Sequence, residues 1–208
     1  MPWLLRSAFS PCIDKKTWED RRIRTFIAIE LPEKLLGLLA GLRVSLDRGF
    51  IRVSWVKTSN MHLTLKFLGE VEESRIEGIV EELSAAARGV KPFTISTGAL
   101  GGFPNLSAPR VVWLGLKDQG ELARLSSDIE DRLEGLNFER EGRPFHPHLT
   151  LCRVKSQAEG RTLGALAAGL EGNINMDFRV DSFMLYKSKL GPGGAEHSVI
   201  KKMELAGK

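Results

Sequence analysis

The sequence predicts an α+β fold with antiparallel sheets, and three observations point to it. Strand-like and helix-like segments are mixed along the 208 residues, and several consecutive strand-like segments are joined by short links. The tetrapeptide His-Leu-Thr-Leu occurs twice, beginning at His62 and at His148. Because a helix and two strands are expected between the copies, the repeat indicates two similar halves.

The first elements follow from composition and hydrophobic spacing. Residues 23–31, rich in β-branched and aromatic side chains, predict a buried strand. Pro32 is suited to open a helix, and leucines at helical spacing continue that helix to Leu46. Residues 50–56 and 61–69 then predict two strands, the second of which contains the first copy of the repeat.

The middle of the chain contains two further helices around a pair of strands. Residues 72–88 predict a helix with its apolar side chains on one face. Residues 93–103 and 110–116 predict strands, and residues 119–135 predict the next helix from the spacing of their leucines and Ile129.

The last third begins with the second copy of the repeat, which is expected to form a strand. A helix is expected near 157–169. Two strand-like segments, 176–188 and 198–205, finish the chain.

Composition places the chain among ordinary globular proteins. Hydrophobic residues make up 42% of it, which suffices for one globular domain with two lobes. No apolar run approaches the length that spans a bilayer, and the apolar stretch at the N-terminus is too short for a signal peptide. Cys12 and Cys152 make neither a disulfide framework nor a zinc motif, so we expect a cytoplasmic protein.

The net charge of +4 is concentrated near the N-terminus. Residues 1–24 contain six Lys or Arg and three Asp or Glu, so the rest of the chain is nearly neutral. A nucleic-acid partner would therefore be held at one local site. Residues 1–22 show no clear periodicity and are interpreted as an N-terminal extension, with a single two-lobed domain over 23–208.

Each copy of the repeat places a histidine and a threonine on the same face of its strand. Alternate side chains of a strand share a face, so His62 lies beside Thr64, with Leu63, Leu65 and Phe67 on the other face. The second copy likewise puts His148, Thr150 and Cys152 together. A single such pair is ordinary in a strand, but two pairs in the same phase indicate a function.

Two imidazoles suit acid–base chemistry, because one can accept a proton while the other donates one near neutral pH. Metal binding is the alternative interpretation. Histidine ligands usually occur with carboxylates or cysteines at set spacings, and no such spacing accompanies His146 and His148. The sequence thus predicts no metal and no cofactor.

At these residues the chain resembles the two-histidine (2H) phosphoesterase superfamily, and most closely its LigT/ThpR branch of RNA 2′,3′-cyclic phosphodiesterases, once named 2′-5′ RNA ligases. The paired motifs His-x-Thr-x carry the resemblance, in "HLTLKFLGE" and "PHLTLCRV". The flanking segments "RTFIAIELP", "PRVVWLGL" and "FMLYKSKLGPGG" support it. The resemblance extends over roughly residues 24–205.

The resemblance implies two lobes related by a pseudo-twofold axis, each an antiparallel sheet with helices outside, and a catalytic cleft between them. The substrate would be an RNA 3′ end or a nucleotide carrying a 2′,3′-cyclic phosphate, converted to a 2′-phosphate without a metal. His62 would protonate the leaving O3′, and His148 would activate water. Thr64 and Thr150 would donate hydrogen bonds to the phosphate, and Arg153 would bind it. We expect a monomer with no membrane partner.

Four nearby residues have open interpretations. Strict alternation puts Arg153 on the leucine face, so it binds phosphate only if the strand ends or bulges there. His197 stands where many relatives have an aromatic residue, and we expect it in an exposed loop. Lys66 is expected on the histidine face, as a nucleotide contact or as a solvated side chain. Phe67 is expected in the core, and Phe145 either in the core or in the cleft wall.

Three functions fit this pattern of residues. The first is a metal-free cyclic phosphodiesterase. The second is an RNA ligase that runs the same site in reverse on tRNA halves, and it would use the same residues. The third is an RNA-end binding protein with little turnover, which the two intact motifs disfavour.

Overall fold

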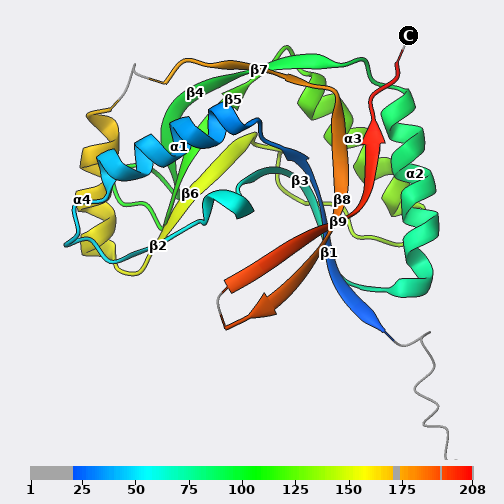
Figure 1. The fold of residues 1–208 in the computed structure, drawn as a ribbon, viewed down its shortest axis with the longest axis horizontal. Helices are drawn as coiled ribbons and strands as arrows, with labels where there is room; N and C mark the ends of the chain where they lie inside the picture. Colours follow the sequence, from blue (N-terminus) through cyan, green and yellow to red (C-terminus); the bar gives the residue numbers. More distant parts are fainter. Residues whose placement is uncertain (1–20, 171–173, 193, 208) are drawn as a thin grey trace, which may run out of the picture.

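The structure is a computed structural model, and it describes residues 21–170, 174–192 and 194–207. Four α-helices and nine strands lie in these described ranges (Figure 1). In chain order they are β1 (Arg22–Glu30), α1 (Glu33–Leu46), β2 (Val53–Trp55), β3 (His62–Glu72), α2 (Ile76–Arg88), β4 (Phe93–Phe103), β5 (Val111–Lys117), α3 (Glu121–Glu134), β6 (His148–Val154), α4 (Gln157–Ala168), β7 (Asp177–Val180), β8 (Ser182–Gly191) and β9 (Gly194–Glu204). Short 3₁₀ turns at Thr58–Asn60 and Glu73–Arg75 precede β3 and α2.

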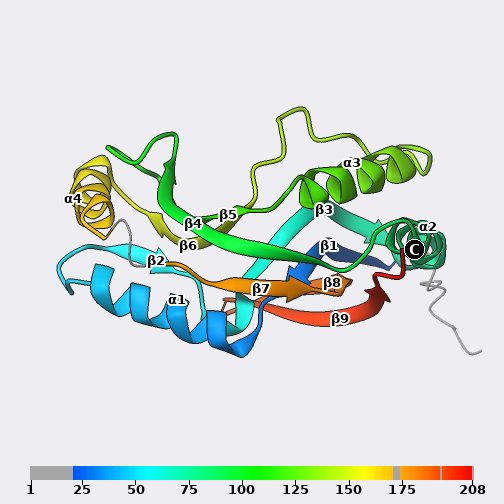
Figure 2. The same cartoon turned by 90° about the horizontal axis from the view of Figure 1, so that it is seen from above.

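The strands form two sheets, and all their pairings are antiparallel. The first sheet has the order β3-β1-β8-β9, and the second has the order β2-β6-β5-β4-β7. Helices α2 and α3 pack together beside the first sheet, whereas α1 and α4 lie beside the second (Figure 1). In the view from above, α4 is at one end of the molecule and α2 at the other (Figure 2). The predicted α+β fold with antiparallel sheets is confirmed.

Each sheet contains one copy of the repeat, because β3 belongs to the first sheet and β6 to the second. The leucines of both copies are at most 5% exposed and join one hydrophobic core that runs behind both sheets. Residues of β3 and β6 come within 8 Å of each other between Cα atoms. The two motif strands are thus anchored to the same core.

The two sheets are not successive halves of the chain. The segment 176–188, expected as one strand, is divided at Asp181 into β7 of the second sheet and β8 of the first. The backbone carbonyl of Asp181 accepts a hydrogen bond from the Leu205 amide, so this residue is used in the crossing and not in either strand. The two parts differ in burial, since β7 alternates between exposed and buried residues whereas β8 begins with five consecutive buried ones.

The final strand begins earlier than expected. β9 starts at Gly194, where φ is 105°, a conformation that glycine adopts without strain. Gly194 pairs with Gly191 and closes the hairpin with β8. His197 therefore lies inside a strand, opposite Ser188, and the expectation of an exposed loop histidine is wrong.

Residues 1–20 of the expected N-terminal extension lie outside the described residues. Arg22 is the first residue of β1 and pairs with Glu72 at the end of β3. The division into an extension and a single domain stays a prediction.

Candidate active site

His62 is the first residue of β3, an edge strand of the first sheet, and its ring packs among other rings. It stacks on Phe26 of β1, with 4.6 Å between ring centroids. Tyr186 of β8 stacks on Phe26 at 5.1 Å and lies 6.3 Å from the His62 ring. Phe26, Tyr186, Ala28 and Met184 make a small hydrophobic cluster, separate from the main core, on which the imidazole rests.

Burial controls the charge of His62. Loss of contact with water lowers the pKa of this histidine to about 4, and repulsion from His197 adds to the effect. A hydrogen bond to the backbone of Asn60 opposes it by favouring the protonated ring. His62 is therefore a neutral imidazole at pH 7 in the free protein.

His197, which the sequence placed in an exposed loop, packs against His62. Its ring meets that of His62 edge-on, at 5.5 Å between centroids, and also contacts Phe26 at 4.9 Å. Its Nδ1 is buried and has no hydrogen-bond partner within the described ranges. Burial lowers the pKa of His197, and the charge of Arg24 lowers it further. Extending the last strand back to Gly194 would have placed His197 on the face of Tyr186.

His148 is the first residue of β6, and aromatic side chains also surround it. Phe103 lies 5.2 Å from it edge-on, and Trp113 lies 6.0 Å away. Trp113 lies flat across β4 because residue 101 is glycine, where a Cβ atom would come within 2.1 Å of the indole. The glycine thereby makes room for the ring that flanks His146 and His148.

A backbone hydrogen bond fixes the tautomer of His148. Its Nδ1 lies 2.7 Å from the carbonyl oxygen of His146, and a carbonyl only accepts, so Nδ1 carries the proton. The lone pair is then on Nε2, which is the atom that can accept a proton. Burial lowers the pKa of His148, and the charge of Arg153 contributes to the lowering. The backbone of Asn60, two residues before His62, likewise favours the protonated form of that ring.

The two motif strands share a β-bulge at the same place. In β3, Leu65 is the extra residue, since Ala28 pairs with Thr64 and Ile27 pairs with Lys66. In β6, Leu151 is the extra residue, since Trp113 pairs with Thr150 and Val112 with Cys152. The bulge follows the motif threonine in both strands and reverses the facing of the residues directly after it. In β3 a second extra residue, Leu68, reverses the facing again before Gly69.

The bulges overturn three expectations from strict alternation. Lys66 and Cys152, expected on the histidine face, are buried on the core side at 7% and 0% exposure. Phe67, expected in the core, is 65% exposed and lies 6.0 Å from Phe26. Arg153 is exposed, on the face of His148, as a bulge was expected to allow.

Buried Lys66 has a structural partner instead of a ligand. Its ammonium lies 2.5 Å from the Glu130 carboxylate of α3 and 2.7 Å from the carbonyl oxygen of Glu139. Glu130 also accepts a hydrogen bond from the amide of Glu141. Lys66 thus ties β3 to the segment that leads into His148. In that segment, Phe145 is partly buried and packs against the core.

Thr64 and Thr150 are half-buried, each two residues after its motif histidine. Neither hydroxyl has a hydrogen-bond partner in the described part of the chain, so both can donate to a ligand. Together the described site residues offer two neutral imidazoles, two hydroxyl donors and one guanidinium, a set suited to an anionic phosphate. Within the same residues, no three His, Cys, Asp or Glu side chains are grouped to hold a metal ion.

None of the four helices in the described ranges is both long enough and apolar enough to cross a membrane.

Similarity to known proteins agrees with this site. The chain is 33% identical over 182 residues to the RNA 2′,3′-cyclic phosphodiesterase of Archaeoglobus fulgidus, covering 88% of this chain and 100% of the relative. It is 33% identical over 187 residues to the enzyme of the same name from Thermotoga maritima, covering 89% and 97%. The crystal structure of TT0787 of Thermus thermophilus superposes with a TM-score of 0.74 at 27% identity, over 89% of this chain and 100% of that one.

The E. coli LigT structure complexed with 3′-AMP superposes with a TM-score of 0.70 at 27% identity, over 89% of this chain and 99% of that one. The sequence profile described as the 2′-5′ RNA ligase superfamily matches residues 50–192, which include both motif strands. The chain therefore belongs to the 2′-5′ RNA ligase superfamily, the two-histidine phosphoesterases that its paired motifs indicate.

Proposed function

We propose that this chain hydrolyses 2′,3′-cyclic phosphates, at RNA 3′ ends or on nucleotides, to 2′-phosphates. The observation that carries the proposal is the equivalence of the two motif strands. Each begins with a histidine bonded to the backbone two residues earlier, and each places a free threonine hydroxyl before the same bulge. Relatives named RNA 2′,3′-cyclic phosphodiesterase and the 3′-AMP complex of LigT support it.

In the proposed mechanism the two histidines flank one cyclic phosphate. Water attacks phosphorus while His148 Nε2 takes a proton from that water. The bond between phosphorus and O3′ breaks, O3′ receives a proton from His62, and the phosphate stays on O2′. Thr64, Thr150 and Arg153 donate hydrogen bonds to the non-bridging oxygens and stabilise the charge that develops on them.

The acid role requires that His62 be protonated in the complex. With a pKa of about 4 it is almost entirely neutral in the free protein at pH 7. A bound phosphodiester brings a negative charge beside the imidazole, and an adjacent opposite charge raises the pKa of a histidine. Substrate binding therefore supplies the protonated form that the leaving group needs.

The test is an assay with a nucleoside 2′,3′-cyclic phosphate in the presence of EDTA. We expect the 2′-phosphate as the product and no loss of rate on chelation. A 3′-phosphate product would overturn the proposed bond cleavage, and a rate restored only by a divalent metal would overturn the acid–base mechanism. Binding without turnover would identify an RNA-end binding protein.

The superfamily's name supports a second candidate, a 2′-5′ RNA ligase that runs the same site in reverse on tRNA halves. In that reaction a 5′-hydroxyl end of RNA would replace water and attack the cyclic phosphate. Incubation of tRNA halves with the enzyme, with product analysis on a denaturing gel, separates the two activities. A cytoplasmic location and a monomeric state remain predictions.

A further inference from the structure

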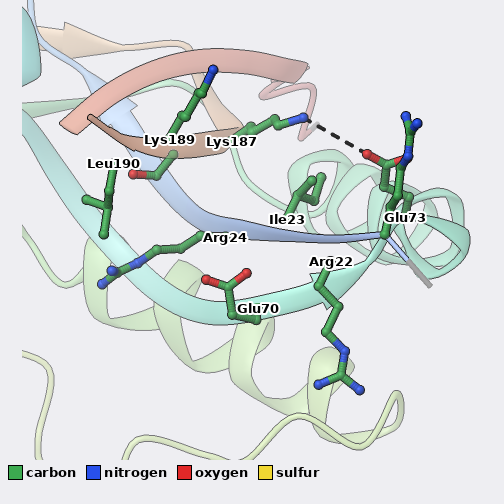
Figure 3. A pocket seen from close by; sticks show the side chains of 10 residues that line it. Arg22, Ile23, Arg24, Glu70, Glu73, Lys187, Lys189 and Leu190 are labelled. Carbon is green, nitrogen blue, oxygen red and sulfur yellow. Dashed lines mark ion pairs between the residues drawn. The ribbon is translucent and has the colours of Figure 1, made fainter. Parts of the chain in front are cut away.

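We infer that a basic pocket beside the candidate active site binds the phosphodiester backbone of RNA, on the 5′ side of the nucleotide that carries the cyclic phosphate. This rests on the proposed function and narrows its substrate to oligoribonucleotides. The pocket lies where β1 and β8 separate and has a volume of about 500 Å³ (Figure 3). Its lining is Arg21, Arg22, Ile23, Arg24, Glu70, Glu73, Lys187, Ser188, Lys189 and Leu190.

The charge of the pocket fits a polyanion. Its lining contains five Lys or Arg side chains and two Glu side chains. Lys187 pairs with Glu73 at 4.0 Å. Arg24 and Lys189 are exposed and form no ion pair with any residue in the described ranges, so they are available to phosphate oxygens. Glu70 lies near Arg24 in Figure 3. Because the lining contains more Lys and Arg than Glu, the net charge of the pocket is positive.

Arg24 connects the pocket to the surface beneath His62, whereas Lys189 follows Ser188 in β8 and lines the pocket from the other face of the sheet. Arg24 and Phe26 are alternate residues of β1, so their side chains share the face on which the His62 ring stacks. Across the sheet, Arg24 pairs with Ser188, and Ser188 pairs with His197. The charge of Arg24 is close enough to lower the pKa of His197, whose ring touches that of His62.

This connection identifies which part of the substrate reaches the pocket. A 2′,3′-cyclic phosphate occupies the 3′ end of its strand, so the remaining nucleotides leave the site only through O5′. The cationic surface begins at Arg24, two residues from Phe26 in β1, so it would contact the first phosphates of the RNA strand on the 5′ side. A nucleoside 2′,3′-cyclic phosphate has no such phosphates and cannot use the pocket.

The test compares two substrates that end in the same nucleotide: adenosine 2′,3′-cyclic phosphate, and a hexaribonucleotide with a 3′-terminal adenosine 2′,3′-cyclic phosphate. We expect wild type to have the higher kcat/KM for the hexanucleotide. The Arg24→Gln/Lys189→Gln variant is expected to lower the ratio of the two kcat/KM values about fivefold, since two exposed charged contacts are lost. It is also expected to weaken the dependence of hexanucleotide binding on salt, with a change in log–log slope of about 0.7 per lost contact.

The matched control is Arg88→Gln/Lys91→Gln, which removes the same charges from exposed positions at the last residue of α2 and just after it. That helix has 13 residues and separates these positions from Glu73 by about 20 Å. The control is expected to leave the ratio unchanged. An equal effect of both variants would mean that RNA is attracted by the net charge of the protein and not by the pocket. An unchanged ratio in Arg24→Gln/Lys189→Gln would also contradict RNA binding at the pocket.

A direct binding measurement separates this proposal from the proposed function. Fluorescence anisotropy with a labelled hexaribonucleotide ending in a 2′-phosphate reports on the pocket without turnover. If wild type hydrolyses neither substrate, the proposed function fails, and the loss of affinity in Arg24→Gln/Lys189→Gln relative to the control still decides the pocket. If wild type hydrolyses both substrates equally and neither variant changes affinity, only the pocket fails.

Discussion

Phe67 and Arg153 occupy the same position in the two motif strands, five residues after the motif histidine, and the bulge in each strand turns both toward the histidine face. The same backbone position thus holds an aromatic side chain in one strand and a cationic side chain in the other. An exposed aromatic ring lies near Phe26 beside His62, and a guanidinium lies on the face of His148. The difference suits a substrate with a flat base at one end and a phosphate at the other.

Phe67→Ala is expected to raise KM about tenfold with little change in kcat, because a base loses its stacking surface. The ring is 65% exposed, so the variant is expected to unfold at nearly the wild-type temperature. Steady-state kinetics and thermal unfolding measure both effects. Phe67→Trp is the control and is expected to keep a low KM. A large loss of stability in Phe67→Ala would show that the ring serves packing instead.

Lys66 and Glu130 form a buried ion pair with side chains only 5% and 11% exposed. Lys66→Met leaves the Glu130 carboxylate uncompensated, and we expect it to lower the free energy of unfolding by about 3 kcal/mol. The double variant Lys66→Met/Glu130→Leu removes both charges and is expected to recover most of that loss. Urea unfolding of the wild type, both single variants and the double variant completes the cycle. Equal losses in the single and double variants would contradict a charge-pair role.

The sequence predicted the identity and order of most elements, because hydrophobic spacing dictates them directly. It also paired each histidine with its threonine correctly, since both precede the bulge. It failed for Lys66 and Phe67, which follow the bulge. A bulge depends on how a strand pairs with its neighbour, and strict alternation within one strand cannot express it.

A signal for the bulge was nevertheless present at Arg153. Alternation would have buried its guanidinium among leucines, at a cost that folded proteins avoid. The same argument, applied to the matching position of the first copy, would have exposed Phe67. His197 was missed for a different reason. The glycine-rich turn before it suggested a loop, whereas the turn is tight and pairing resumes at Gly194.

The contact between His197 and His62 predicts a measurable shift in titration. His197→Phe removes the repulsion between two imidazolium rings but keeps an aromatic side chain. The pKa of His62 is therefore expected to rise above about 4, while burial, the larger cause, still holds it below its ordinary value. NMR titration of the His62 ring protons measures this. His146→Phe, next to the other motif, is expected to leave the His62 titration unchanged. A fall in the pKa of His62 in His197→Phe would contradict the assigned repulsion.

The low pKa of His62 also affects stability. The unfolded chain binds a proton at His62 near pH 6.5, whereas the folded protein binds it only near pH 4. The contribution of His62 to the free energy of unfolding is therefore fully present above about pH 6.5 and is lost as pH falls toward 4. Urea unfolding between pH 7 and pH 4 is expected to show a smaller decline in His62→Phe than in wild type.

The last prediction separates the roles of the two histidines. His62→Ala and His148→Ala are each expected to lower kcat by about 10²–10⁴-fold, the range of a lost general acid or base. The double variant is expected to be less impaired than the product of these factors, because the two residues act as a unit.

An aryl phosphodiester distinguishes acid from base, because its leaving group departs without protonation. Wild-type turnover of this diester must first be established. His62→Ala is then expected to regain much of its rate on this substrate, whereas His148→Ala still lacks water activation and regains little. The opposite pattern would exchange the two roles. Exchanged roles are the main alternative, because His62 is neutral in the free protein and a neutral imidazole can act as a base. Equal rescue of both variants would mean that neither histidine has a distinct role.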